Sequence, residues 1–200
     1  MRSALLVCLS FLFFSCQEKK QIFVAPTVAN INEVIQAVIL KDSLPVYKTD
    51  KGGAVICTRL IKLDIKVMPS KKEGQLIAQI ESGNYVYVQQ LLYSSKKHLA
   101  YFSKKDSTYL LYQNKVNKSV DIYSDLSKKL KTISVEELDT PSSGFAPYYT
   151  LSIPIFSRDG NTAYVEVNAY FGDGGGGSAV VLKRENGEWE IADFFRTWFS

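Results

Sequence analysis

Residues 172–177, Gly-Asp-Gly-Gly-Gly-Gly, match the spacing G-x-G-x-x-G of a phosphate-binding loop. In such a loop a helix follows the glycines, and its N-terminal N–H groups bind the phosphates. Here residues 178–184 read as a short strand, because an Asn186-Gly187 hairpin turn follows at once. Gly177-Ser178 also has no lysine, which a Walker loop requires. We therefore predict a mobile hairpin loop at the glycines and no nucleotide site.

Glu166 and Asp193 are the two carboxylates that we consider for catalysis, because the pattern places them on neighbouring or nearby strands. A glycoside hydrolase needs two carboxyl groups roughly 5–10 Å apart across a cleft. Surface carboxylates on strands are common, so the alternative is that neither has a catalytic role. The single histidine, His98, would have to serve any Ser-His-Asp triad, and one histidine excludes a zinc site built from several. We interpret His98, which follows Lys96 and Lys97, as an ordinary surface or strand residue.

The N-terminal segment MRSALLVCLSFLFFSC ends in a cysteine that could carry a lipid. Its apolar run, residues 4–15, is shorter than the ~20 residues that a membrane-spanning helix needs, and has the length of a secretory signal. Phe13-Phe14-Ser15-Cys16 resembles a bacterial lipobox, with a small residue before the cysteine. An ordinary cleavage site would require a small residue where Phe13 stands.

We therefore predict that residues 1–15 are a lipoprotein signal peptide and that Cys16 becomes the acylated N-terminus of the mature protein. Two or more acyl chains, palmitate among them, would hold it at a bacterial membrane, which we expect to be the outer membrane. The alternative is an uncleaved N-terminal anchor. Residues 16–26 then form the lipidated cysteine and a tether, and residues 27–200 form a single domain.

Charge and cysteine usage limit the partners. Residues 94–131 carry nine basic and three acidic side chains, whereas residues 132–200 carry four and ten. The basic segment could contact acidic lipid headgroups, or its lysines could simply be solvated. An exported protein without an arginine-rich or stacking motif is not expected to bind nucleic acid. Cys57 would be the only thiol beside Cys16 after processing, so we expect no intrachain disulfide, and we interpret Cys57 as a small buried hydrophobe.

The elements that would position these residues begin with a helix over residues 27–40. Its apolar side chains recur at spacings of three and four, with Asn30 and Glu33 as candidate capping residues. Alternation or apolar runs predict strands at residues 60–68, 85–88, 99–102 and 107–113. Shorter capping signals begin at Ser124 and at Ser134.

The C-terminal third predicts a four-stranded meander. Apolar residues occupy every second position of residues 151–155, which predicts a strand. Pro154 favours an edge strand, because proline has no backbone N–H to donate to a neighbouring strand. Residues 163–171 alternate more regularly, and the strands at 178–184 and from Trp189 onward flank the Asn-Gly turn. The expected fold class is α+β: an N-terminal amphipathic helix packed on a mainly antiparallel sheet that ends in this meander.

The lipobox ending FSC, the segments NINEVIQAVILKDSL and KKDSTYLLYQN, and the stretch from SIPIFSRDGNTAYVEV to the WFS ending resemble uncharacterised secreted lipoproteins of Bacteroidota. The resemblance covers about half of the chain and implies no activity. It also implies that a cysteine-containing turn of such relatives is replaced here by residues 172–175.

Three functions remain open from the sequence. The first is a non-enzymatic envelope lipoprotein that binds a protein or a glycan through the edge at residues 151–156 or the aromatic tail at residues 194–199. For these aromatic residues, packing in the core is the alternative. The second is a carboxylate-dependent envelope hydrolase that uses Glu166 and Asp193. The third is a protein that binds a small ligand in the concavity of the sheet. No cofactor or metal is expected for any of them.

Overall fold

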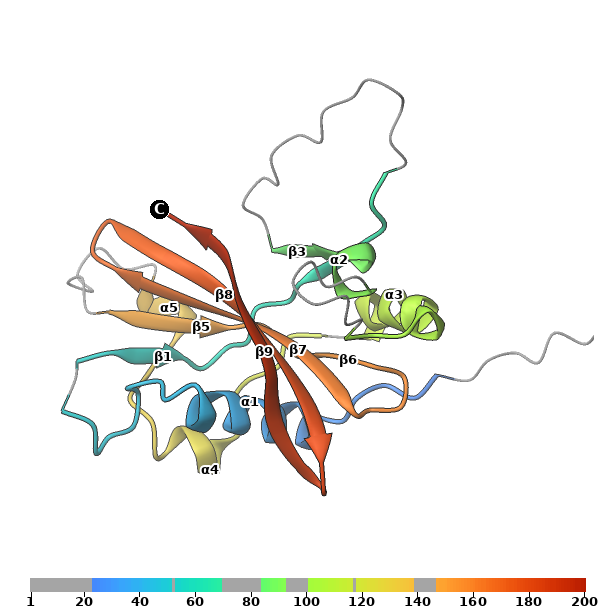
Figure 1. Ribbon diagram of the computed structural model, residues 1–200. Helices are drawn as coiled ribbons and strands as arrows, with labels where there is room; N and C mark the ends of the chain where they lie inside the picture. The colour runs from blue at the N-terminus through green and yellow to red at the C-terminus, as the bar shows by residue number, and fades with distance from the viewer. Residues whose placement is uncertain (1–22, 52, 70–83, 93–100, 117, 139–146) are drawn as a thin grey trace, which may run out of the picture.

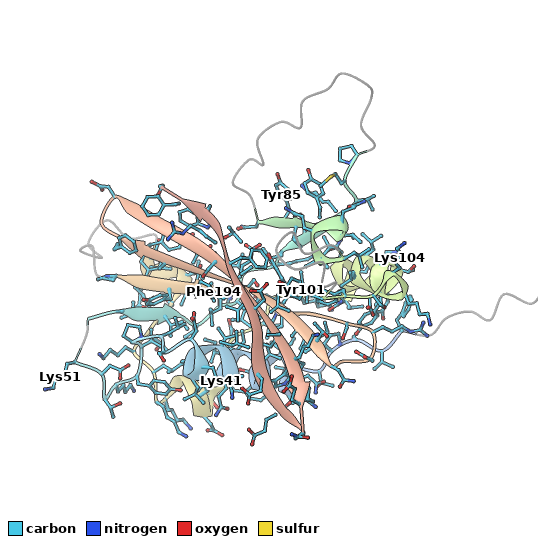
Figure 2. All side chains as sticks on the ribbon, viewed as in Figure 1. Lys41, Lys51, Tyr85, Tyr101, Lys104 and Phe194 are labelled. Carbon is cyan, nitrogen blue, oxygen red and sulfur yellow. The ribbon has the colours of Figure 1, made fainter. Side chains whose placement is uncertain are left out.

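The computed structural model describes residues 23–51, 53–69, 84–92, 101–116, 118–138 and 147–200, and the account below concerns these residues. They form a mixed structure in which a twisted sheet is the main element and a few helices pack around it (Figure 1). None of the helices in this part of the chain has the length and apolarity that crossing a membrane requires.

Helix α1, Val28–Lys41, begins at Thr27, whose side chain accepts a hydrogen bond from the Asn30 backbone N–H. The Asn30 side chain in turn accepts from the Thr27 N–H, so the capping pair is Thr27 and Asn30. The prediction that Asn30 and Glu33 cap the start of this helix was therefore wrong. Glu33 instead forms an ion pair with Arg184 of strand β8.

The large sheet has the strand order β4-β1-β5-β7-β8-β9, and β6 also pairs with β7. Its strands are β1 Val55–Cys57, β4 Thr132–Ile133, β5 Tyr148–Leu151, β6 Ile155–Phe156, β7 Thr162–Phe171, β8 Gly174–Glu185 and β9 Glu188–Phe199. Strand β1 pairs in parallel with β4 and β5, and all other pairs are antiparallel. The predicted C-terminal meander is therefore confirmed as β5 and β6, β7, β8 and β9.

The sheet has a hydrophobic core on each face, because successive side chains of a strand point to opposite sides. On one face α1 packs against side chains such as Val165, Val167 and Val180. On the other face Tyr164, Ala179 and Val181 join a second core. That core also includes residues of the small parallel sheet, β2 Asp64–Lys66 and β3 Tyr85–Tyr87, and of the helices α2 Val88–Leu92 and α3 Ser107–Val116 (Figure 1).

Strand β3 confirms the strand predicted at residues 85–88, and β2 occupies only the middle of the strand predicted at 60–68. Two predictions of this region were wrong. Residues 107–113 belong to α3, because Ser103 and Asp106 cap a short 3-10 helix, Lys104–Asp106, that leads into it. Residues 101 and 102 are not in a strand, and residues 99 and 100 lie outside the described residues, as does His98.

Of the two shorter capping signals, one is confirmed. Helix α4, Ser124–Ser127, starts at the predicted serine, but its N-cap is Tyr123 and no side chain caps it. At α5, Val135–Leu138, the Ser134 side chain accepts from the Glu137 N–H, while the Glu137 carboxylate accepts from the Ser134 N–H. The turn at Asn186-Gly187 has positive φ at both residues (51° and 90°), as a type I′ hairpin requires.

The segment at residues 151–156 is not an exposed edge, as the sequence analysis expected. Strand β5 lies between β1 and β7, and Pro154 separates it from β6. Leu151, Ile153 and Phe156 are at most 3% exposed. The side chain of Gln113 on α3 accepts from the Phe156 N–H and donates to the Phe156 carbonyl, so a helix side chain takes the place of the next strand.

Candidate functional site

One end of the sheet carries aromatic and polar side chains on the face opposite to α1. Strand pairing places Tyr148 beside Tyr170, and Thr150 beside Asn168. On β8, Gly175 pairs with Tyr170 and Gly177 pairs with Asn168. Trp198 of β9 pairs with Gly177. We call this surface the aromatic face and define it as Tyr148, Thr150, Asn168, Tyr170, Gly175, Gly177 and Trp198. Neither hydrophobic core of the described residues includes its three aromatic side chains.

The indole of Trp198 lies over a floor of two glycines. A Cβ atom on Gly177 would overlap the indole near Nε1, and one on Gly175 would lie 2.9 Å from the far end of the same ring. The ring therefore extends along β8 from Gly177 to Gly175 and uses the space that side chains would fill. The Trp198 Nε1 donates to the Asn168 Oδ1 at 2.7 Å, which fixes its orientation in the plane of the sheet. The register shift between Gly177 and Ser178 accompanies this placement on β9.

Two tyrosines extend the aromatic surface from Trp198. The Tyr148 and Tyr170 rings stack with centroids 4.7 Å apart and planes 16° apart. The Tyr170 ring is tilted by 43° to the Trp198 indole, with centroids 5.7 Å apart. All three side chains are half-buried. Burial raises the pKa of Tyr148. The rings thus touch one another in a continuous row across β5, β7 and β9.

Polar groups accompany this row. Thr150 and Asn168 are buried, and the Thr150 hydroxyl has no hydrogen-bond partner among the described residues. Glu166, two residues from Asn168 on β7, points to the same side of the sheet. Its half-buried carboxylate accepts from the Tyr164 hydroxyl at 2.9 Å. Burial raises the pKa of the Glu166 carboxyl, and the Tyr164 hydrogen bond only partly offsets this. The site therefore offers hydroxyl, amide and carboxyl groups beside an aromatic surface, in a partly dehydrated environment.

The predicted carboxylate pair does not come together as neighbours. Glu166 pairs with Ala179 on β8, and Asp193 pairs with Val181, so the two acids are two strands apart and offset along the strands. Strand spacings of about 4.8 Å and 3.3 Å per residue put their Cα atoms ~12 Å apart. Phe195, which pairs with Ala179, is the residue of β9 directly across from Glu166. The arrangement does not reproduce two carboxyls facing each other across a cleft.

The glycines are not a hairpin loop, so this prediction was also wrong. Gly174 to Gly177 begin strand β8, and the turn is formed by Gly172, with φ 57°, and Asp173. A strand follows the glycines, so no helix N-terminus is present to bind a phosphate. The residues that match G-x-G-x-x-G thus provide a floor for Trp198.

Cys57 is buried at 3% exposure, as predicted, and burial raises the pKa of its thiol. Cys16 and residues 1–22 lie outside the described residues. Within the described residues no group of three or more His, Cys, Asp or Glu side chains could hold a metal ion.

A depression with a volume of about 550 Å³ lies away from the aromatic face, where Ser103 and Asp106 approach Arg158 and Asp159. The Asp106 carboxylate accepts from the backbone N–H and hydroxyl of Ser103 and from the Arg158 N–H. The Asp159 carboxylate accepts from the Ser157 hydroxyl and the Asn161 N–H. These carboxylates hold the loops together, so they are engaged in structure.

Of the predicted aromatic tail at residues 194–199, Trp198 lies on the aromatic face, whereas Tyr148, Thr150, Asn168 and Tyr170 were not predicted from the sequence. The signal was present in two places. Tyr170 and Asn168 are on the outward side of the regular alternation at residues 163–171, and glycines at alternate positions of a strand often mark a close approach by another group. Neither the alternation at residues 163–171 nor the glycines predict that β5 pairs with β7.

No protein-family model, curated protein or solved structure matches this chain. A function has to be inferred from the residues and their geometry.

Proposed function

We propose that this protein is an envelope lipoprotein, exported and anchored by an acylated Cys16, whose domain binds an envelope component through the aromatic face. The observation that carries the binding role is the placement of Trp198, flat on Gly175 and Gly177 with its Nε1 bonded to Asn168. Glycines make room for the indole at a half-buried position, and the result is a fixed aromatic surface beside a small number of polar groups, a combination of side chains that also lines ligand sites.

The anchoring part of the proposal rests on the sequence of residues 1–16 alone. In it, residues 1–15 are removed, residues 16–26 form the tether, and residues 27–200 form one α+β domain in which the amphipathic helix after the tether covers one sheet face. The aromatic face is on the other side, so it stays available while the helix side is covered. The outer membrane is the expected location, with an envelope protein or a glycan as partner.

A carboxylate-dependent hydrolase is the second candidate, favoured by Glu166 alone. Burial raises the pKa of its carboxyl, which is the direction of shift that a general acid needs. The second carboxylate that such an enzyme needs is two strands away at Asp193. The geometry therefore supports binding better than hydrolysis.

Membrane fractionation tests the anchor. Cys16→Ser should move the protein from the membrane fraction to a soluble fraction, and the matched variant Cys8→Ser, in the signal itself, should leave it in the membrane. Membrane retention of Cys16→Ser would refute lipid anchoring.

Crosslinking in intact cells tests the binding role. A photoreactive residue in place of Tyr148, a half-buried member of the aromatic face, should capture a specific component. The same residue in place of Leu40 on α1, 52% exposed, should not capture it. Equal capture at both positions would count against a binding role of the aromatic face.

A further inference from the structure

We propose that the aromatic face binds a neutral polysaccharide of gluco-configured pyranose units, with one sugar ring stacked on the outward side of Trp198. This inference rests on the proposed binding function and adds the chemical class of the ligand.

The Trp198 indole presents a flat and rigid surface. One side of the Trp198 indole contacts Gly177 and Gly175, so only its outward side is available to a ligand. The hydrogen bond from Nε1 to Asn168 holds the ring in place before binding, which lowers the entropy cost of association. A flat and rigid aromatic surface suits a ligand that also has a flat apolar side. A pyranose with equatorial substituents has one, because only axial C–H groups project from its ring face.

The three aromatic rings do not form a cage for a quaternary ammonium group. Such a cage needs aromatic walls separated widely enough for the cation to enter between them. Here the ring centroids are 4.7 Å apart for Tyr148 and Tyr170, and 5.7 Å apart for Tyr170 and Trp198, so the rings already contact one another. A ligand can lie on this row but cannot enter it.

Polar contacts also constrain the ligand. The Asn168 Oδ1 is engaged by Trp198, so Asn168 would present its amide Nδ2 as a donor. The Thr150 hydroxyl beside it is buried beneath the face, so it does not reach a ligand on the surface. Glu166 adds an acceptor two residues along β7. Sugar hydroxyls both donate and accept, so they match this mixed set of groups.

Charge constrains the ligand as well. The aromatic face as defined has no lysine or arginine, and Glu166 is the ionisable acid next to it. Arg196 pairs with Ser178 on the opposite side of the sheet, where its guanidinium lies over the Phe199 ring. An anionic polymer such as one bearing phosphate or sulfate groups would find no counter-charge within the face. The ligand is therefore expected to be neutral.

The test measures binding of cellohexaose to the full-length protein, purified in detergent, by isothermal titration calorimetry. We expect binding by the wild type and at least about a tenfold loss of affinity in Trp198→Ala, the size typical of a buried aromatic anchor. Phe199→Ala is the matched control, because Phe199 is 71% exposed and faces the other side of β8 at Gly176. It should change the affinity by less than about twofold. Equal affinities in Trp198→Ala and the wild type would overturn the proposed site.

A second variant guards against misfolding of Trp198→Ala. Trp198→Phe keeps an aromatic ring on β9 and loses the Nε1–H that donates to Asn168, so it should unfold cooperatively and bind more weakly than the wild type. Wild-type affinity in both Trp198→Phe and Trp198→Ala would overturn the proposed site. No heat of binding for the wild type at up to about 10 mM cellohexaose, a concentration that would reveal a Kd even in the millimolar range, would overturn the ligand class. Specific crosslinking at Tyr148 would in that case leave the binding function itself standing.

Discussion

The Trp198 indole nitrogen donates to the Asn168 side-chain oxygen at 2.7 Å across strand β8, at the level where β8 carries Gly177. Strands β7 and β9 are not neighbours in the sheet, so this hydrogen bond joins two strands over the top of a third. Any side chain at residue 177 would stand between the two groups. The bond, the glycine and the flat indole are therefore one structural unit, and the β9 terminus depends on it.

Gly177→Ala should destabilise the protein by about 2 kcal/mol, the range of an overpacked site. The added Cβ would lie 2.6 Å from the Asn168 Oδ1 and overlap the indole of Trp198. Gly176→Ala is the matched control, because its Cβ would meet only ordinary contacts, the nearest being Phe199 at 3.6 Å. Urea unfolding of the two variants measures the difference. Equal stability of both would show that the indole does not depend on the glycine floor.

Gln113→Leu should destabilise the protein by roughly 2–4 kcal/mol, since it removes both partners of the buried Phe156 backbone groups. Leucine fills a similar volume, so the loss would report the hydrogen bonds rather than a cavity. Gln36→Leu, on the exposed side of α1, should stay within about 0.5 kcal/mol of the wild type. If Gln113→Leu lowers the free energy of unfolding no more than Gln36→Leu does, water must bind the Phe156 N–H and carbonyl in the variant.

The C-terminal meander was predictable because its signals are local. The alternation at residues 163–171 fixes two faces, and Asn186-Gly187 has the residues that a type I′ turn needs. The helix at residues 107–116 was missed although its signal was also local: Ser103 and Asp106 have capping-box spacing. Its tyrosines and leucines read as strand formers, whereas Tyr109, Leu110 and Gln113 fall on one helical face.

The aromatic face was less predictable because it depends on pairing over long distances in sequence. Four glycines in a row have a strong preference for loops, and only the indole 21 residues beyond Gly177 makes them suitable for a strand. The place of Tyr148 beside Tyr170 likewise follows from the register of β5 on β7. Local propensity carries no information on either relationship.

Asp106→Ala should lower the free energy of unfolding by about 3 kcal/mol. The change removes the acceptor of three hydrogen bonds, two from Ser103 and one from the Arg158 N–H, at a residue 6% exposed. It would therefore release the start of α3 and the turn after β6 together. Asp125→Ala is the control, because the Asp125 side chain is 92% exposed and its ion pair with Lys128 is on the surface. Thermal unfolding of both variants provides the measurement, and similar transition temperatures would contradict the proposed role of Asp106.

Glu166→Gln should change the pH dependence of stability. Burial raises the Glu166 pKa above its ordinary value of 4.5, so the native state binds this proton more tightly than the unfolded chain. The free energy of unfolding must then fall as the pH rises from the ordinary value through the native pKa. Glutamine does not titrate and can still accept from the Tyr164 hydroxyl, so the variant should gain stability relative to the wild type as the pH rises above the ordinary value of 4.5.

Urea unfolding across that pH range measures the effect, with Glu188→Gln as control because Glu188 is exposed at the start of β9. The stability difference between Glu188→Gln and the wild type should stay nearly constant with pH. If the stability difference between Glu166→Gln and the wild type is also constant with pH, ionisation of Glu166 does not destabilise the native state. Such a result would also remove the property that makes Glu166 a candidate general acid, and with it the support for the hydrolase alternative.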